Sequence, residues 1–582
     1  MPVQHTYPDT FNTSADPRLS CSTEHIITLP VDLLTGQKKL ATMETEEKRR
    51  NSRRQSTRLL ARDFYTGETL QIRPSDSRPT IARGTTRDRI DMQRMGKKQE
   101  LRRSFRQLST ISFTSCVMGN WEILLTANGP ALNNGGPSGI FWSLIWTWTG
   151  QLYVIMSLAE MSSMAPTSAG QYHWVSEFLP PGWQRFLSFC TGWLSTMAWQ
   201  SVVAVDCYII VGIIQALIQL GHPEYDPTRW QATLLTIATA VGLCLFNIFA
   251  ASQLSLLEGV FAVCHVFLFV PVVVMLWILA PTSNPQEALF TFANQGGWPS
   301  TALSLLIGQV PMIFTTLGSD SVAHLAEEVE NAAVVVPQAM LWSYLVNAPL
   351  ALLMAFTIIF NIGPVENAIQ SAYPFVYMFE TALQNTQATT AFTIVMLVLL
   401  AMVTVSVIAS TSRQMFAFAR DNGLPFSRWL KRVSVQFNVP VNAIIATGGF
   451  TVALSLINIG STVAFNAVLS LSTTALMASY IISIGCVTRK RLTNETLPYA
   501  PWSLGRYGLP VNLIALGYAT WSFFWAFWPT EYHVTAGNMN WACLIFLGFV
   551  AWACVMFRLS SLRRRDKYEG PVARVQVWMN DW

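Results

Sequence analysis

The chain of 582 residues is 51% hydrophobic and 12% aromatic, only 12% of it is charged, and its formal net charge is +5. Soluble globular domains carry about twice that charged fraction, so the composition excludes an ordinary soluble enzyme and indicates an integral membrane protein. The nine cysteines include no CxxC pair and no histidine partner at ligand spacing, so we expect neither a disulfide framework nor a metal site. No cofactor is expected.

The first 106 residues differ from the rest in charge. They hold 21 Lys and Arg against 13 Asp and Glu, a formal charge of +8. This stretch is rich in Ser, Thr and Arg and has neither sustained apolar periodicity nor a signal-peptide core, so residues 1–106 are predicted to be a disordered, cytosolic tail. RRNS and RRQS (49–56) suggest kinase sites, and kinases or trafficking proteins are candidate partners. A basic tract beside anionic lipid is the favoured interpretation.

The remaining chain reads as an all-α membrane domain over residues 107–558, followed by a short cytosolic tail, 559–582. Each crossing of a bilayer needs about 20 predominantly apolar residues, and polar interruptions cut this domain into twelve segments. The third and eighth are long enough to be strongly tilted. We place the segments at 109–129, 138–161, 185–218, 229–251, 255–280, 301–326, 340–361, 389–419, 441–460, 463–488, 508–528 and 538–558.

Basic residues flank these segments on one side, as the positive-inside rule requires. With the amino terminus in the cytosol, the predicted outer loops hold only Arg229, and an even number of spans returns the carboxyl terminus to the cytosol. The predicted cytosolic flanks hold Arg185, Arg413, Arg420, Arg428, Lys431, Arg432, Arg489, Lys490, Arg491, Arg506 and the RRRDK run at 563–567.

Two segments are interrupted by polar residues at membrane depth. Such a break is tolerated only where it is buried or lines a cavity, and transporters with inverted repeats bind their substrate between two such broken helices. The breaks lie in segments one and six, which stand five apart as a five-plus-five repeat requires. The predicted substrate-binding residues are Asn120, Trp121 and Glu122 in the first break and Gly318, Ser319, Asp320 and Ser321 in the second.

Several motifs together resemble one family: the amino acid–polyamine–organocation superfamily, and within it the fungal amino acid and choline permeases that include GABA permeases. The resemblance implies a ten-helix core of two inverted five-helix repeats with two further helices, and alternating access around a site between helices one and six. The motifs are NNGGPSG (133–139), SLAEMSSMAPTSAGQYHWVSEF (157–178), GWLSTMAWQ (192–200), GSDSVAHLAEEVENAAVVVPQAM (318–340), SRQMFAFARDNGLPFSRW (412–429) and VPVNAI (439–444).

The second break can bind a carboxylate through backbone amides, because a helix that restarts there leaves N–H donors free. Side chains offer no substitute, since Arg229 is the only Lys or Arg between Arg185 and Arg413. Nearby acids can receive an ammonium group. Asp320 is the leading candidate, although it could instead cap the restarted helix. Glu122 is the second candidate to bind the ammonium group. The ring of Trp121 could contact the same group through a cation–π interaction.

Four ionisable residues within the segments are candidates for proton coupling, since intramembrane ionisable groups are functional by default. Each can also be explained as a hydrogen-bonded packing residue. The lysine that related bacterial transporters carry in the fifth helix is absent here, so that device does not transfer. The candidates are Asp206, Glu258, His265 and Asp320.

Four charged residues near the predicted cytosolic ends of segments six and eight are candidates for an inner gate. Glu327 and Glu328 follow segment six, and Arg413 and Arg420 end segment eight, where they could pair with acids during gating. The alternative for the glutamates is a solvated charged turn.

These features predict a secondary active transporter, proton-coupled, that imports an amino acid or a GABA-like amine. A choline or polyamine permease of the same fold is the alternative, and a transport-dead amine receptor is a further one. No Walker loop or catalytic motif is present, so neither an ATP motor nor an enzyme is expected. The expected partners are the small-molecule substrate, protons and the lipid bilayer, and nucleic acid is not one. The plasma membrane is the expected location, with the vacuolar membrane as the alternative.

Overall fold

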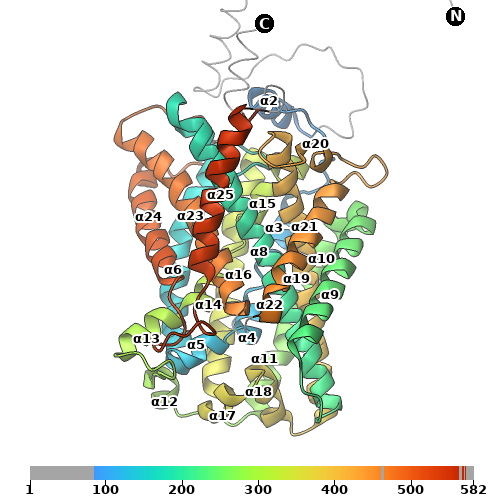
Figure 1. Cartoon of the computed structure of the whole chain (residues 1–582), viewed down its shortest axis with the longest axis vertical. Coiled ribbons are helices and arrows are strands. Elements are labelled where there is room, and N and C mark those ends of the chain that lie inside the picture. The colour runs from blue at the N-terminus through green and yellow to red at the C-terminus, as the bar shows by residue number, and fades with distance from the viewer. Residues whose placement is uncertain (1–83, 461–463, 563–566, 569, 572–582) are drawn as a thin grey trace, which may run out of the picture. The chain divides into compact units, whose positions relative to one another are not determined.

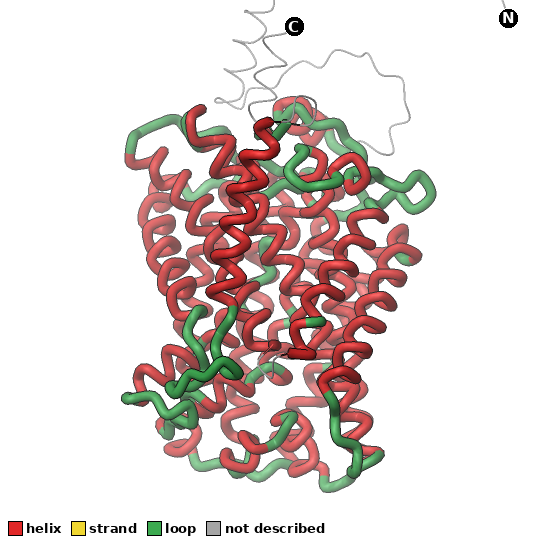
Figure 2. The backbone as a smooth tube through the Cα atoms, viewed as in Figure 1, coloured by secondary structure: helices red, strands yellow, loops and turns green. Residues whose placement is uncertain are grey.

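The computed structural model describes residues 84–460, 464–562, 567, 568, 570 and 571, all within one compact unit, Arg62–Trp582. The predicted kinase-site motifs at 49–56, most of the predicted tail and the RRRD run at 563–566 lie outside the described residues. In the described part the chain is a bundle of helices without a sheet (Figures 1 and 2). Two isolated bridges join Phe105 to Val329 and Asn134 to Asn294.

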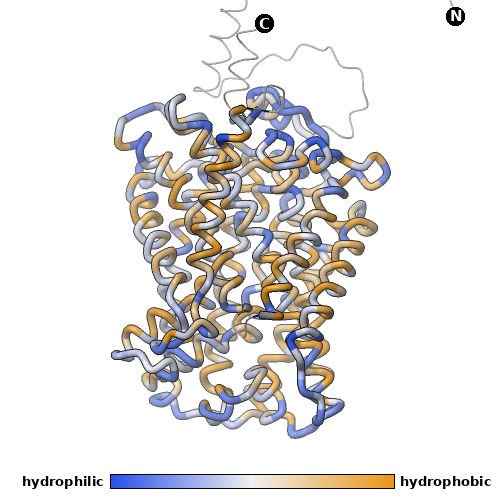
Figure 3. The backbone as a smooth tube through the Cα atoms, in the orientation of Figure 1, coloured by the Kyte–Doolittle hydropathy of each residue, from blue (hydrophilic) through white to orange (hydrophobic). Residues whose placement is uncertain are grey.

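The composition of the helices fits a multi-pass membrane protein. Hydrophobic residues dominate the middle of the bundle, and hydrophilic residues gather at its two ends (Figure 3). Eight described segments are long and apolar enough to cross a bilayer, which confirms an all-helical membrane protein; the count of twelve spans and the inverted repeat stay predictions. The eight are Pro181–Gly221, Arg229–Phe249, Ala251–Leu279, Ala332–Asn361, Thr386–Arg420, Val441–Ile459, Phe465–Leu492 and Ala542–Leu562.

Each predicted segment coincides with one or more helices. Segments one, five, six and nine are divided, and the third and eighth form the longest helices, α8 and α19. The helices are α3 (Gln107–Met118) and α4 (Asn120–Thr126), α6 (Gly136–Met164), α8 (Pro181–Gly221), α9 (Arg229–Phe249), α10 (Leu254–Phe267) and α11 (Phe269–Leu279), α13 (Thr301–Gly308), α14 (Val310–Thr315) and α15 (Ser321–His324), α16 (Ala332–Asn361), α19 (Thr386–Arg420), α21 (Val441–Ser455) and α22 (Ile457–Gly460), α23 (Ala464–Leu492), α24 (Gly508–Trp525) and α25 (Ala542–Leu562).

Shorter helices cover both ends of the bundle. We call the end that carries α2 and α20 the α2 face; it lies at the top of Figure 1, with α5, α12, α17 and α18 at the opposite end. The short elements are α2 (Thr86–Arg94), α5 (Gly129–Asn133), α7 (Gln171–Phe178), α12 (Pro285–Phe290), α17 (Val365–Gln370), α18 (Pro374–Leu383), α20 (Ser427–Leu430) and the 3-10 turns η2 (Ala251–Gln253), η3 (Ala326–Glu328) and η4 (Gly505–Tyr507).

Residues 84–106 are folded, which corrects the disordered assignment for this end of the predicted tail. A capping box at Thr85 starts α2: its side chain accepts the amide of Asp88, whose carboxylate accepts the amide of Thr85. The Asp88 carboxylate also accepts the amides of Asn331 and Ala332, each at 2.9 Å, at the start of α16. Polar contacts with distant backbone therefore order this segment together with four buried apolar side chains, Met92, Met95, Leu101 and Phe105.

The two predicted helix breaks are present, and each depends on a glycine. Gly119 has a φ of 46° and separates α3 from α4, while Gly318 has a φ of 101° between α14 and α15. Side chains with a Cβ atom are strained at such angles. Both breaks are buried, so the backbone groups that they leave outside a helix face protein.

Candidate functional site

The two broken helices meet at their breaks. A Cβ atom at Gly318 would lie 3.4 Å from the Cα of Met118 and 3.5 Å from the carbonyl oxygen of Val117, so the second break lies against the backbone of the first. The side-chain amide of Asn120 donates a hydrogen bond to the carbonyl of Thr315 and holds α4 against α14. The chain thus brings together two interruptions that lie about 200 residues apart.

A small cavity lies at this junction. Its walls come from α3, α4, α8, α14, α23 and the loop that holds Gly318. Most of the side chains are apolar, and Asp206 is the only charged one among the described residues that line it. They are Val117, Met118, Ile123, Trp199, Val202, Asp206, Phe314, Leu317, Gly318 and Leu476.

Backbone donors of the second break remain available. Neither Gly318 nor Ser319 lies in a helix, and within the described residues neither amide has an acceptor, whereas the amide of Ser321 donates to the carbonyl of Gly318 at 3.0 Å. Unpaired buried N–H groups cost free energy comparable to a lost hydrogen bond. These two amides are therefore suited to an anionic group of a bound molecule.

Asp206 provides the opposite charge. The residue is 1% exposed, and neither of its carboxylate oxygens has a hydrogen-bond partner among the described residues. No described cation lies within ion-pair distance of the Asp206 carboxylate, so nothing in the described part of the chain offsets the cost of burying its charge. A charge buried in this way is costly unless something pairs with it.

The other residues predicted for the two breaks lie outside the cavity lining. Asp320 precedes α15 but does not cap it, because its carboxylate instead accepts the side-chain amide of Gln171 at 2.7 Å. Trp121 points toward α10 and α11: its indole donates to the carbonyl of His265 at 3.1 Å, and its ring packs edge-on against Phe269. Of the seven predicted substrate residues, Gly318 alone lines this cavity.

Glu122 and His265 form a buried polar cluster beside the cavity. The Nδ1 atom of His265 lies 2.7 Å from Oε1 of Glu122, and its Nε2 atom lies 3.0 Å from Oδ1 of Asn347. Three helices, α4, α10 and α16, therefore share one hydrogen-bonded unit. An imidazole between a carboxylate and an amide can exchange a proton with the carboxylate.

Glu258 lies in a second buried polar contact, one that also joins two helices. The hydroxyl of Ser406 in α19 is 2.7 Å from Oε1 and 2.9 Å from Oε2 of Glu258 in α10. Glu258 is fully buried and has no cationic partner among the described residues. This contact therefore joins α10 to α19 through one buried carboxyl group.

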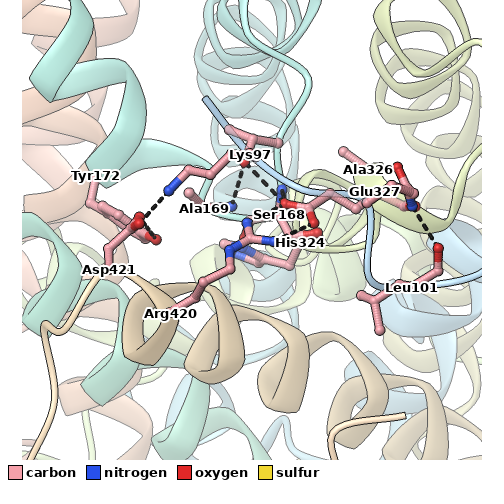
Figure 4. Close-up of polar contacts among 12 residues, drawn as sticks. Lys97, Leu101, Ser168, Ala169, Tyr172, His324, Ala326, Glu327, Arg420 and Asp421 are labelled. Carbon is pink, nitrogen blue, oxygen red and sulfur yellow. Dashed lines mark hydrogen bonds and ion pairs between the residues drawn. The ribbon is translucent and has the colours of Figure 1, made fainter. Parts of the chain in front are cut away.

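At the α2 face the predicted gate residues are paired, and three of them, Glu327, Glu328 and Arg413, are buried. Figure 4 shows the pair of Glu327 with Arg420. Glu327 accepts two hydrogen bonds from Arg420, at 2.5 and 2.7 Å, and Glu328 accepts one from Arg413 at 2.8 Å. Glu327 is 0% and Glu328 6% exposed, so the alternative of a solvated turn is wrong for these two glutamates. The pairs connect the end of the sixth segment to α19.

Residues 97–105 make further polar contacts beside these ion pairs at the α2 face. Lys97 pairs with Asp421, which also accepts the hydroxyl of Tyr172 at 3.0 Å. Burial lowers the pKa of Lys97, and the Asp421 carboxylate opposes that shift. Arg103 donates to the carbonyls of Ala326 and Val329 on the far side of the Glu327 pair.

Sequence reasoning missed part of this arrangement. Trp199 lines the cavity but carries no local signal, since tryptophan is common in membrane helices. Lys97 and Arg103 lie within residues 1–106, which the sequence predicts to be a disordered tail. A run of basic residues followed directly by a membrane segment, here KKQELRR at 97–103, is the signal that could have found them.

Known proteins resemble this chain over most of its length. It is 28% identical over 447 residues to a Macrophomina phaseolina protein named for amino acid/polyamine transport, covering 76% of this chain and 98% of that protein. It is 26% identical to an uncharacterised amino-acid permease of Schizosaccharomyces pombe, covering 84% of this chain and 90% of that protein. It is 24% identical to the choline transporter of Saccharomyces cerevisiae, covering 79% and 81%. A family model described as amino acid permease matches residues 105–549, and the chain belongs to that family.

Proposed function

We propose that this permease is a proton-coupled secondary transporter that imports an amino acid or a GABA-like amine by alternating access. The observation that carries the proposal is the cavity between the two helix breaks, where the free amides of Gly318 and Ser319 and the carboxylate of Asp206 line or border one space. A zwitterion presents one group of each charge to such a cavity. The amides supply hydrogen bonds to a carboxylate without any basic side chain.

A choline or polyamine permease is the second candidate, and one observation favours it. The only charged side chain that the described residues contribute to the cavity is an acid, and the Trp199 indole lies on the same wall. Such a combination suits a quaternary ammonium, which needs no carboxylate partner. The relative in Saccharomyces cerevisiae that carries the name choline transporter supports this alternative.

Proton coupling is assigned to the buried groups beside the cavity. Glu122, His265 and Asn347 form one hydrogen-bonded unit, and Glu258 with Ser406 forms another. Both units join helices of the first and second halves of the chain. Gain or loss of a proton changes which of these helix contacts is favourable, so protonation can bias the protein toward one open state.

The ion pairs at the α2 face are assigned to the inner gate, and this face to the cytosol. Opening there has to separate Glu327 from Arg420 and Glu328 from Arg413, because each pair bridges the sixth segment and α19. Such buried ion pairs stabilise the conformation in which the α2 face is closed, and they are broken in the conformation in which it is open, as expected of a gate.

Uptake measurements test the proposal. Cells that express the chain are given radiolabelled GABA, a neutral α-amino acid, choline and putrescine in parallel, at two external pH values and with a protonophore. We expect one compound to accumulate, more at the lower pH, and the protonophore to abolish accumulation. Accumulation that ignores the protonophore would contradict proton coupling. No accumulation despite normal surface expression would contradict transport of these substrate classes.

A further inference from the structure

The sequence made Asp206 a candidate proton carrier, but its surroundings differ from those of the other buried acids. Glu122 contacts His265, Glu258 contacts Ser406, and Asp320 contacts Gln171. Asp206 has no hydrogen-bond partner within the described residues, and it lines the cavity. If this carboxylate is charged, only the contents of the cavity can pair with it.

The walls around Asp206 indicate what that partner is. Val117, Val202 and Leu476 offer no hydrogen bond, so much of the wall suits the apolar part of an organic molecule. Trp199 lies seven residues before Asp206 in α8, which places both on one face of the helix about 10 Å apart along its axis. The Trp199 indole N–H also lacks a partner among the described residues. An acid and an aromatic ring on the same apolar wall of a cavity are a combination that suits an organic ammonium.

We propose that Asp206 is the ammonium-binding residue of the transported substrate, which is accordingly a compact amine: a zwitterion such as GABA or a quaternary amine such as choline. That the bound amine is also transported rests on the proposed function. Binding of an ammonium group at Asp206 does not depend on transport. The ammonium pairs with the carboxylate, and the apolar body of the substrate contacts the remaining walls. No Lys or Arg in the described part of the chain competes for this site.

The test compares pairs of compounds that differ only in the ammonium group. Butyrate is GABA without its ammonium, and 3,3-dimethyl-1-butanol is choline without its charge. The melting temperature of the purified protein is measured in the presence of each compound. In cells, each compound is also added as a competitor for uptake of the substrate that the cells accumulate. In the wild type we expect the ammonium member of at least one pair to raise the melting temperature and to compete, and the member without the ammonium group to do neither.

The variant Asp206→Asn should remove this preference. We expect its KM to rise about ten- to a hundredfold, the range for losing a hydrogen bond to a charged group, with an unchanged or higher melting temperature for the empty protein. Asp206→Glu keeps the charge and should retain the preference with weaker binding. Asp226→Asn, in the exposed loop before α9, is the matched control and should behave like the wild type.

Three outcomes overturn the inference while leaving the proposed function intact. One is an unchanged KM in Asp206→Asn. Another is retained exchange with unchanged KM but lost accumulation, which would identify Asp206 as a proton carrier. The third is equal competition, in the wild type, by the members of each pair with and without the ammonium group. If the wild type accumulates nothing, the proposed function fails, and the melting-temperature comparison still decides: stabilisation by the ammonium compound alone, lost in Asp206→Asn, supports the inference, and its absence overturns it.

Discussion

Buried acids occur at two levels of this molecule, and they differ in their partners. At the α2 face, Glu327 and Glu328 are each hydrogen-bonded to an arginine. At the level of the helix breaks, Asp206, Glu258 and Asp320 have no cation within the described residues. The first arrangement stabilises one conformation of the protein. The second leaves charge or hydrogen-bonding capacity for something that enters from outside, either a substrate or a proton.

The largest effect is expected from breaking a pair at the α2 face. Arg420→Ala leaves Glu327, which is 0% exposed, without its cation, so we expect a loss of about 3–5 kcal/mol in the stability of this conformation. The measurement is thermal unfolding of the purified protein. The double variant Arg420→Ala/Glu327→Gln should recover part of the loss. If Arg420→Ala alone is as stable as the wild type, the ion pairs at the α2 face do not stabilise this conformation, and the contrast with the unpaired acids at the helix breaks is wrong.

A smaller loss of stability, with complete loss of transport, is expected at the second break. Gly318→Val introduces a branched side chain at a φ of 101° and against the backbone of Met118. Strain of this kind costs about 1–3 kcal/mol. Gly242→Ala in α9 is the control, because no atom lies within 4 Å of its added Cβ. Uptake by Gly318→Val at normal surface expression would show that the break is not needed for transport.

A modest effect is expected where a buried acid depends on one hydroxyl. Ser406→Ala removes the hydrogen-bond partner of Glu258, which should cost about 1–2 kcal/mol if the carboxyl group stays buried. If Glu258 takes part in proton coupling, the pH dependence of uptake should also shift relative to the wild type. An unchanged melting temperature and an unchanged pH profile together would remove this pair from the comparison.

The smallest effect is expected at the surface of the α2 face. Arg106 and Glu330 lie 3.6 Å apart, and their side chains are 83% and 41% exposed. Arg106→Ala should therefore change stability by less than about 0.5 kcal/mol. Arg103→Ala, three residues earlier, is the matched contrast, because Arg103 is buried and donates to two backbone carbonyls. Equal melting temperatures of the two variants would argue against burial as the deciding factor.

Much of the helical architecture was predictable, because apolar length determines which segments can cross a bilayer. The two breaks were predictable for a related reason, since a polar, glycine-containing interruption of a helix at membrane depth is tolerated only where it is buried or lines a cavity. The side chains around them were not. Trp121 and Glu122 belong to a helix that is buried on nearly every side, so no polar face indicated how it is rotated. One residue of error turns a helical side chain by about 100°.

The boundary of the tail was wrong for a different reason. Residues 84–106 have no apolar period, which ordinarily indicates disorder. Their order comes partly from a few buried apolar side chains, such as Leu101 and Phe105, and partly from contacts such as that of Arg103 with the carbonyl of Ala326, 223 residues away. Backbone carbonyls occur at every residue and leave no mark on composition. A polar segment that binds them therefore looks disordered in the sequence.

The carboxylate of Asp88 has a consequence for how the protein is made. Its acceptor role at the start of α16 requires the amide of Asn331, which the ribosome adds 243 residues later. At about 5–20 residues per second, that interval lasts roughly 10 to 50 seconds. During this time the contact of Asp88 with the start of α16 cannot form. Completion of the α2 attachment is thus a late event in biogenesis, and an antibody or protease that recognises only α2 without this contact would distinguish incomplete chains from finished ones.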